Sequence, residues 1–242
     1  MPSDDRTTPS PLKGPLCAVF MPALVGDGLA DLQKRLGAKA TLSDPERGPS
    51  SGHAVSDHAA ALAAAFAGAT FDAGATVVGT DRDVALGTLR WSDGGRRPVR
   101  TAVVAVRKKS REIDVRVYYA HTGDARMELL PTDMRLVLAK PVGIFLDALA
   151  EGDVEQAVSL FEEGAIVTDA LGAEHGKPAG AMATFLGGLA QGGFDCEPSG
   201  SADDGRTCVV EANFQTGPVK RPGVYVFERG DSGLFTRLAT YP

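Results

Sequence analysis

The chain has 242 residues, a length that suits two small domains or one large one. The formal net charge is −6 and no lysine or arginine cluster covers one segment, which argues against nucleic acid as a partner. No apolar run approaches the roughly 20 residues of a membrane span, and three cysteines without CxxC spacing argue against a disulfide framework or a zinc site. We therefore expect a globular, cytoplasmic protein without a membrane or nucleic-acid partner.

The first part of the chain reads as helices followed by strands. Residues 1–14 are rich in Pro and Ser and lack an apolar core, so they predict a disordered leader and not a secretion signal. Asp27, between two glycines, can end one helix and cap the next. Periodicity then changes from about 3.6 to 2. It predicts helices over 16–26, 29–36 and 53–68, a strand over 38–44, a loop over 45–52, and hairpin strands over 70–79, 83–91, 99–108 and 112–121.

The second part repeats this order. "ATLSD" at 40–44 is matched by "AIVTD" at 165–169, and each is a short apolar strand that ends on an aspartate. Between the copies, residues 123–137 mix polar and apolar types and predict a linker with one extra strand or docking segment. The second copy predicts helices over 141–152, 153–164 and 181–193, a strand over 165–171, a loop over 172–180, and strands over 194–201, 206–215, 223–230 and 234–241.

An antiparallel sheet preceded by three helices is an α+β arrangement with helices on one face. The expected fold is two curved antiparallel sheets, each covered by about three N-terminal helices. The expected domains are 15–122 and 138–242.

The stretch "FLDALAEGDVEQAVSLFEEGAIV", followed by "AEHG" and "YVFERGDSGLFTRL", resembles the nuclear-transport-factor-2-like superfamily and, within it, the SnoaL-like polyketide cyclase group. The resemblance implies cone-shaped sheets with a pocket at the open end, and chemistry on a hydrophobic small molecule without a cofactor or metal. It also implies that the tandem sheets pack together as a pseudo-dimer inside a monomeric chain, or that the protein is a homodimer.

Asp44 and Asp169 are the repeated polar pair. Each either acts as a base near the pocket rim or accepts backbone N–H groups of the following loop, and we favour the loop role. Asp169 is also a candidate substrate contact. His175 in "AEHG" is expected to be structural.

In the first copy, Asp114, Arg116 and Tyr118 share one face of the last strand, which is either a cavity lining or a solvent or interdomain face. Arg116 and Tyr118 match an "R-x-Y" motif of the resembled family, so with Asp44 they form one candidate catalytic set. Trp91 and His58 are candidate substrate contacts, although a solvated helix histidine is the simpler interpretation of His58.

In the second copy, "VVEANF" places Glu211 and Asn213 on one face of a strand. If that face is concave, burial would suit Glu211 to acid-base work and Asn213 to binding a substrate carbonyl. The alternative is an outward face. Tyr225 and Arg237 are further candidate substrate contacts.

The chain departs from the family at the final strands, where relatives often carry "R-x-Y-x-D". The runs here are Arg237, Ala239, Tyr241 and Arg116, Tyr118, Ala120. Both lack the aspartate, which puts proton transfer through it in doubt and suits either a binding protein or catalysis by substrate preorganisation. The hypothesis is a cofactor-free cyclase, isomerase or epoxide hydrolase of secondary metabolism. The alternatives are a non-catalytic small-molecule binding protein with one degenerate domain, and an interaction module.

Overall fold

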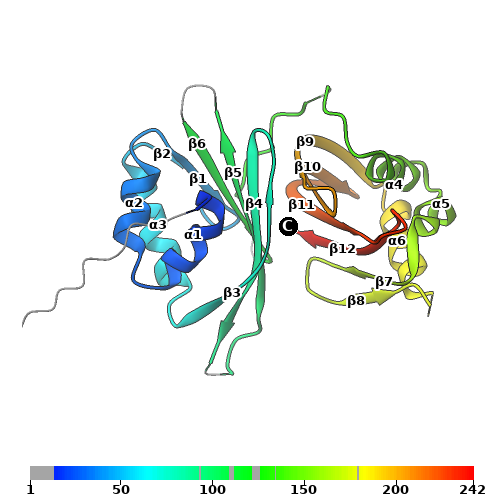
Figure 1. Cartoon of the computed structure of the whole chain (residues 1–242), viewed down its shortest axis with the longest axis horizontal. Coiled ribbons are helices and arrows are strands. Elements are labelled where there is room, and N and C mark those ends of the chain that lie inside the picture. The colour runs from blue at the N-terminus through cyan, green and yellow to red at the C-terminus, as the bar shows by residue number, and fades with distance from the viewer. Residues whose placement is uncertain (1–13, 93, 109–111, 122–125, 134, 179) are drawn as a thin grey trace, which may run out of the picture.

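A computed structural model describes residues 14–92, 94–108, 112–121, 126–133, 135–178 and 180–242. The expected leader lies almost entirely outside these residues. Figure 1 shows two units, with the helices on the outer sides and the two sheets facing each other in the middle. The predicted α+β fold with two helix-covered sheets is confirmed.

The first unit runs from α1 to β6. Its sheet has the order β2-β1-β6-β5-β4-β3, in which β1 is parallel to β6 and the other neighbours are antiparallel. The elements are α1 (Leu16–Val25), α2 (Leu29–Leu36), β1 (Thr41–Asp44), β2 (Gly48–Ser51), α3 (Ala54–Ala65), β3 (Ala69–Val78), β4 (Arg82–Trp91), β5 (Val99–Arg107) and β6 (Ile113–Tyr119).

The second unit runs from α4 to β12 and repeats that topology in the order β8-β7-β12-β11-β10-β9. Here too the first strand, β7, is parallel to the last strand, β12. The elements are α4 (Lys140–Glu151), α5 (Val154–Ser159), β7 (Phe161–Thr168), β8 (Glu174–Gly176), α6 (Ala181–Gln191), β9 (Asp195–Asp203), β10 (Thr207–Thr216), β11 (Val219–Arg229) and β12 (Phe235–Tyr241).

Three local predictions were wrong. The expected loops at 45–52 and 172–180 contain the short strands β2 and β8, each of which pairs with the strand before it. The helix expected over 153–164 ends at Ser159, because Phe161 already pairs with Phe235 in the parallel ladder. Each unit therefore has six strands, and its sheet is mixed rather than purely antiparallel.

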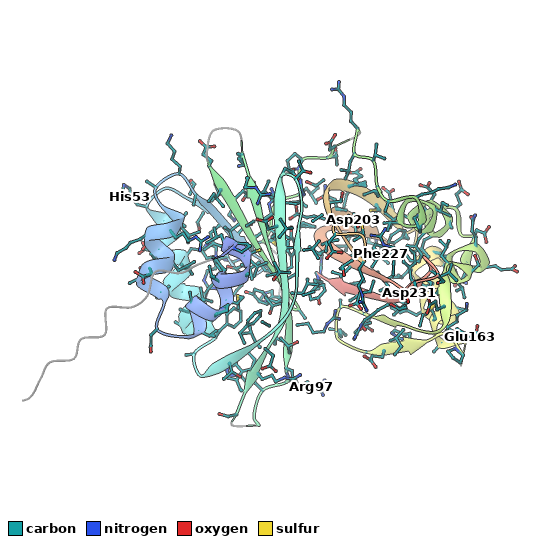
Figure 2. All side chains as sticks on the ribbon, viewed as in Figure 1. His53, Arg97, Glu163, Asp203, Phe227 and Asp231 are labelled. Carbon is teal, nitrogen blue, oxygen red and sulfur yellow. The ribbon has the colours of Figure 1, made fainter. Side chains whose placement is uncertain are left out.

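Each unit has its own core between its sheet and its helices. In the second unit Phe145 of α4 is fully buried and meets Phe161, Phe227 and Phe235 edge-on, at centroid distances of 5.7, 5.4 and 6.2 Å. Edge-to-face aromatic packing of this kind adds to the stabilisation from buried area. Figure 2 shows the labelled Phe227 inside this unit, whereas Glu163 and Arg97 lie at the periphery.

A third cluster, which we call the seam, lies between the two sheets and is built from the opposite face of each. Alternate residues of a strand point to opposite faces, so strands such as β4 and β10 are buried on both sides. The seam contains Val77, Val84, Leu86, Ala102, Val104, Tyr118 and Met127 from the first part of the chain, and Ala202, Val209, Val224, Val226, Ala239 and Tyr241 from the second.

The described part of the expected linker docks on both units. The Arg126 N–H donates to the Pro45 carbonyl at 2.8 Å, and the Asp133 N–H donates to the Pro198 carbonyl at 2.9 Å. This segment is a docking segment and not an additional strand.

Candidate functional site

A cavity of about 430 Å³ lies in the second unit between α6 and the helix-covered face of the sheet. Its apolar walls come from α6, from β10 and β11, and from the loop after β7. Such an enclosure, mostly apolar with a few polar groups, is the usual form of a small-molecule site. The apolar and aromatic lining residues are Leu171, Phe185, Leu189, Phe214, Val219 and Tyr225.

Tyr225, which the sequence predicts as a substrate contact, lines this cavity. Its ring stacks on Phe214 at a centroid distance of 3.9 Å and an interplanar angle of 11°. Burial raises the pKa of the Tyr225 phenol, so the phenol stays protonated at neutral pH. Its hydroxyl makes no hydrogen bond to the described residues, which leaves a hydrogen-bond donor for a bound molecule.

Asp169 also lines the cavity and holds the loop between β7 and β8. Its Oδ1 atom accepts hydrogen bonds from the N–H groups of Leu171 and Ala173, both at 2.9 Å. Its Oδ2 atom lies 3.2 Å from Nε2 of His175, and the His175 ring stacks on Phe185 at 4.3 Å. The carboxylate therefore both orders the loop and orients an imidazole.

The pKa of Asp169 lies below its usual value. Partial burial works in the opposite direction, but the hydrogen bonds from His175, Ala173 and Leu171 outweigh it. The carboxylate is consequently ionised at neutral pH, and an ionised carboxylate stabilises a protonated imidazole beside it.

The equivalent aspartate of the first unit, Asp44, is completely buried. Its Oδ2 atom is hydrogen-bonded to Nε2 of His58, and Oδ1 accepts from the Tyr119 hydroxyl at 2.9 Å and from the Glu46 N–H at 2.7 Å. Nδ1 of His58 in turn lies 2.8 Å from Oγ of Ser50. Burial alone would raise the pKa of Asp44, but these hydrogen bonds lower it below its usual value.

The structure differs from two interpretations of the sequence, which concern His58 and the tyrosine that contacts Asp44. His58 is 4% exposed, so it is not the solvated helix histidine that we favoured, because Asp44 draws it inward. The tyrosine that reaches Asp44 is Tyr119, whereas Tyr118 points to the opposite face of β6. The expected set of Asp44, Arg116 and Tyr118 is therefore not brought together.

Glu211 lies in the seam and not on the helix-covered face. Its carboxylate is 1% exposed and accepts hydrogen bonds from Arg82 and Arg116, each at 2.8 Å, and from the Tyr118 hydroxyl at 2.6 Å. The neighbours Cys208, Val210 and Ala212 occupy the helix-covered face of β10, so strand alternation sends Glu211 to the other face. Arg116 and Tyr118 join Glu211 across the two units.

A glycine makes room for this cluster. A Cβ atom on Gly200 would stand 1.7 Å from the guanidinium carbon of Arg82, so no other residue fits unless Arg82 moves. Sequence reasoning missed Arg82, which stands at the start of β4 next to Asp81 and resembles an ordinary turn charge.

Asn213 lies on the seam side of the same strand but binds the linker. Its Oδ1 atom accepts from the Leu130 N–H at 2.8 Å, and its amide nitrogen donates to the Leu130 carbonyl at 2.9 Å. These two hydrogen bonds satisfy both backbone polar groups of Leu130 in the linker. Asn213 and Glu211, predicted as one constellation, thus have separate partners.

The remaining candidates lie outside the cavity lining. Trp91 packs on the first-unit core and donates from Nε1 to the Ala67 carbonyl at 3.2 Å. Arg237 is half-exposed and reaches Thr168 and Glu174, both at 3.3 Å. Sequence reasoning missed Phe185, Leu189 and Phe214, because apolar residues that line a cavity carry the same pattern as core residues.

Within the described residues, no group of three or more His, Cys, Asp or Glu side chains is arranged to hold a metal ion. None of the helices in the described parts of the chain has the length and apolar character needed to cross a membrane.

Comparison with known proteins gives one family match. Residues 142–238 match the family described as the SnoaL-like domain. No curated protein sequence matches the chain.

Similar solved structures include a protein of Sinorhizobium meliloti provisionally assigned as a polyketide cyclase, with 24% identity and a TM-score of 0.38 over 43% of this chain and 94% of that one. Another is the epoxide hydrolase/cyclase-like enzyme SalBIII, which has a role in pyran ring formation in salinomycin, with 20% identity and a TM-score of 0.39 over 43% and 88%. A third is the orange carotenoid protein of Anabaena binding canthaxanthin, with 19% identity and a TM-score of 0.39 over 48% and 44%.

The family match lies within the second unit, and the first unit repeats the element order of the second. The unit that contains the 430 Å³ cavity therefore matches the SnoaL-like domain family, and it is preceded in the same chain by a second helix-and-sheet unit of the same topology.

Proposed function

We propose that the cavity of the second unit binds a hydrophobic small molecule and that the protein is a cofactor-free enzyme acting on it, of the cyclase, isomerase or epoxide hydrolase type. The observation that carries this proposal is the combination of aromatic walls with two kinds of polar group. These groups are the free hydroxyl of Tyr225 and the carboxylate of Asp169, which line the cavity, with His175 held behind Asp169.

The chemistry would be limited acid-base assistance to a preorganised substrate. The Tyr225 hydroxyl can donate to an oxygen that gains negative charge, and such donation is strongest in a site from which water is excluded. Nδ1 of His175 has no hydrogen-bond partner among the described residues, whereas Nε2 is held by the ionised Asp169. This arrangement suits His175 to accept a proton while the carboxylate stabilises the resulting imidazolium.

The apolar walls would contribute by holding the substrate in a reactive shape. Phe185 and Leu189 give aromatic and aliphatic surface from α6, and Phe214 gives aromatic surface from β10. Holding reacting groups in contact can supply a large part of a rate enhancement without any charged catalyst. Cyclisation of a flexible apolar molecule gains most from holding its reacting groups in contact.

A non-catalytic binding protein is the second candidate function. One observation favours it: both oxygens of the Asp169 carboxylate are already occupied by protein donors. A carboxylate in that state is a weak base, so all proton transfer would depend on His175.

The test separates binding from turnover. We expect Leu189→Trp to fill the cavity and to reduce binding of an apolar fluorescent probe, 1-anilinonaphthalene-8-sulfonate, by at least about tenfold. The matched control is Leu129→Trp, because Leu129 is 54% exposed and does not line the cavity. Equal probe binding by Leu189→Trp and wild type would remove this cavity from the proposal.

Turnover is then measured by mass spectrometry on a panel of polyketide-like ketones and epoxides. We expect Tyr225→Phe and His175→Gln to keep probe binding and to lose turnover by about 10²–10⁴-fold, the usual contribution of a positioned acid or base. Probe binding by the wild type without turnover of any panel member would favour the binding protein over the enzyme.

A further inference from the structure

A second cavity, of about 160 Å³, lies where the two units meet. Its first-unit walls are Pro45, Tyr119, Ala120 and His121, and Met127 of the linker closes it. The Tyr119 hydroxyl donates to the buried carboxylate of Asp44, which fixes the position of this wall residue.

The two cavities adjoin each other. Ala170, Leu171, Arg221 and Pro222 line both of them. Leu171 stands at the boundary and is 88% exposed, which is unusual for a leucine in a loop whose backbone is tied down by Asp169. An exposed apolar side chain on an ordered loop between two apolar hollows marks a surface for an apolar ligand.

The first unit also fixes the wall of the larger cavity. Arg100 of β5 donates to the Asp169 carbonyl at 3.1 Å, and its guanidinium lies 4.4 Å from the centroid of the Tyr241 ring. Asp169 and Tyr241 both line the second-unit cavity. The loop that separates the two cavities is therefore held by side chains of both units.

The charge at the junction selects the class of ligand. Arg221 lines both cavities, is exposed, and forms no salt bridge with any residue that the structure describes. His121 also lines the smaller cavity. An arginine at the mouth of an apolar site favours a carboxylate, which it binds with charge-assisted hydrogen bonds.

We propose that the two cavities form one continuous site for an elongated apolar acid that carries its carboxylate partway along the chain, with one arm in the second unit, the carboxylate near Arg221, and the other arm extending past Leu171 against Ala120 and His121. This inference rests on the proposed function, because it assumes that the second-unit cavity binds an apolar ligand. It adds that the first unit completes the site.

Calorimetric titration of the full chain with 2-alkyldodecanoic acids, whose carboxylate lies between a fixed long arm and a second arm of about 1, 3 or 6 carbons, tests the proposal, since each buried methylene should raise affinity roughly three- to fourfold. We expect this rise to continue through the longest acid in the wild type. In Ala120→Trp the indole fills the smaller cavity, so the longest acid should lose at least about tenfold while the shortest is unchanged. Ala38→Trp, on an exposed position that lines neither cavity, is the matched control.

The outcomes distinguish this inference from the proposed function. If Ala120→Trp binds the whole series like the wild type while Leu189→Trp binds none of it, the extended site is wrong and the second-unit cavity stands. If no acid binds the wild type although the fluorescent probe does, the acid site is wrong and the proposed function stands. If Leu189→Trp binds all the acids normally, both ideas fail. Matched 2-alkyl-1-alkanols that bind as tightly as the acids would overturn the assignment to an acid.

A measurement without substitutions covers the case in which Ala120→Trp does not fold. The acid with the longest second arm, carrying a diazirine group at the end of that arm, is irradiated with the wild-type protein, and the labelled peptides are identified. The inference places this arm in the smaller cavity, so labelling of either His121 or Met127 supports it. Labelling confined to residues of α6 and β10 overturns it.

Discussion

The two units hold the same aspartate in different surroundings. Leu42 pairs with Ser50 of β2 and Val115 of β6, and Val167 pairs with His175 of β8 and Leu238 of β12. The register makes Asp44 and Asp169 equivalent, and it makes Ser50 the counterpart of His175.

The histidine partner has changed its element between the units. His58 and Phe185 are each the fifth residue of α3 and α6, so the first unit takes its imidazole from the helix and the second takes it from the short strand. In the first unit the pair is buried under Tyr119. In the second it stands beside the cavity, with a phenylalanine against the ring. The same carboxylate thus supports a closed core in one unit and a candidate site in the other.

The units also differ where they meet. The ladders make Val84 of β4 equivalent to Val209 of β10, so Leu86 corresponds to Glu211 and Arg82 to Thr207. Arg116 corresponds to Ala239, two positions away from the alignment of "R-x-Y" that the sequence suggested. The two arginines that meet in the seam come from the first unit, and Glu211, the carboxylate that joins them, comes from the second. Such complementarity favours the pairing of unlike units over like ones.

Removal of the seam carboxylate should have the largest effect. Glu211→Leu introduces the residue of the equivalent first-unit position and removes the buried carboxylate that joins the guanidinium groups of Arg82 and Arg116. Asp81 and Asp114 remain as one partner for each guanidinium, but neither replaces the buried contact. We expect a loss of about 3–5 kcal/mol in the free energy of unfolding, measured by urea titration.

The matched control completes the exchange. The triple variant Glu211→Leu, Arg116→Ala and Arg82→Thr gives each position the residue of its counterpart and removes all three charges. It should recover most of the loss, because an apolar replacement of a buried ion cluster is often neutral or stabilising. A triple variant no more stable than Glu211→Leu would show that the ion cluster is not the cause.

The two aspartates should differ in their contribution to stability. Asp44→Asn removes a fully buried charge that is bound by His58 and Tyr119, and we expect a cost of about 2–4 kcal/mol. Asp169→Asn keeps an oxygen for the two loop N–H groups in a partly exposed site, so about 1 kcal/mol is expected. Thermal unfolding of both variants is the measurement. Equal costs would contradict the distinction between a core pair and a site pair.

The contribution of the Asp44 charge to the unfolding free energy should depend on pH. The pKa of Asp44 is lowered from 3.8 in the folded state, so its stabilisation is fully present above that unfolded value and is lost as the pH falls through the folded value. The difference in unfolding free energy between wild type and Asp44→Asn should therefore shrink below about pH 5 and continue to shrink at lower pH. A difference that grows on acidification would mean that the sign of the shift is wrong.

The sequence predicted the repeat, the order of helices and hairpin strands, and the aspartate at the end of the first strand in each copy. These features depend on local periodicity and turn chemistry. The hydrogen bonds of Asp44 and Asp169 to the following loop N–H groups are those expected of Asp in a turn.

The location of Glu211 could not be predicted. Alternation shows that Glu211 and Val210 are on opposite faces of a strand, but it does not show which face the helices cover, and in β10 both faces are buried. The strands β2 and β8 were missed because Gly48, Pro49 and Gly176 are typical of loops. The cavity depends on contacts between α6 and β10, which are set by tertiary packing and not by either segment alone.

The smallest expected difference concerns the turn between the first two helices of each unit. Asp153 caps α5 by accepting the Gln156 N–H at 2.9 Å, whereas α2 begins after Gly28 with no side-chain cap and the expected cap, Asp27, is exposed. Asp153→Ala should therefore cost about 1 kcal/mol and Asp27→Ala less than about 0.5 kcal/mol in urea titrations. A similar cost for both would mean that Asp27 stabilises its turn by another route, such as the charge it places near the start of α2. The two copies would then differ only in the geometry of the cap and not in what the aspartate contributes.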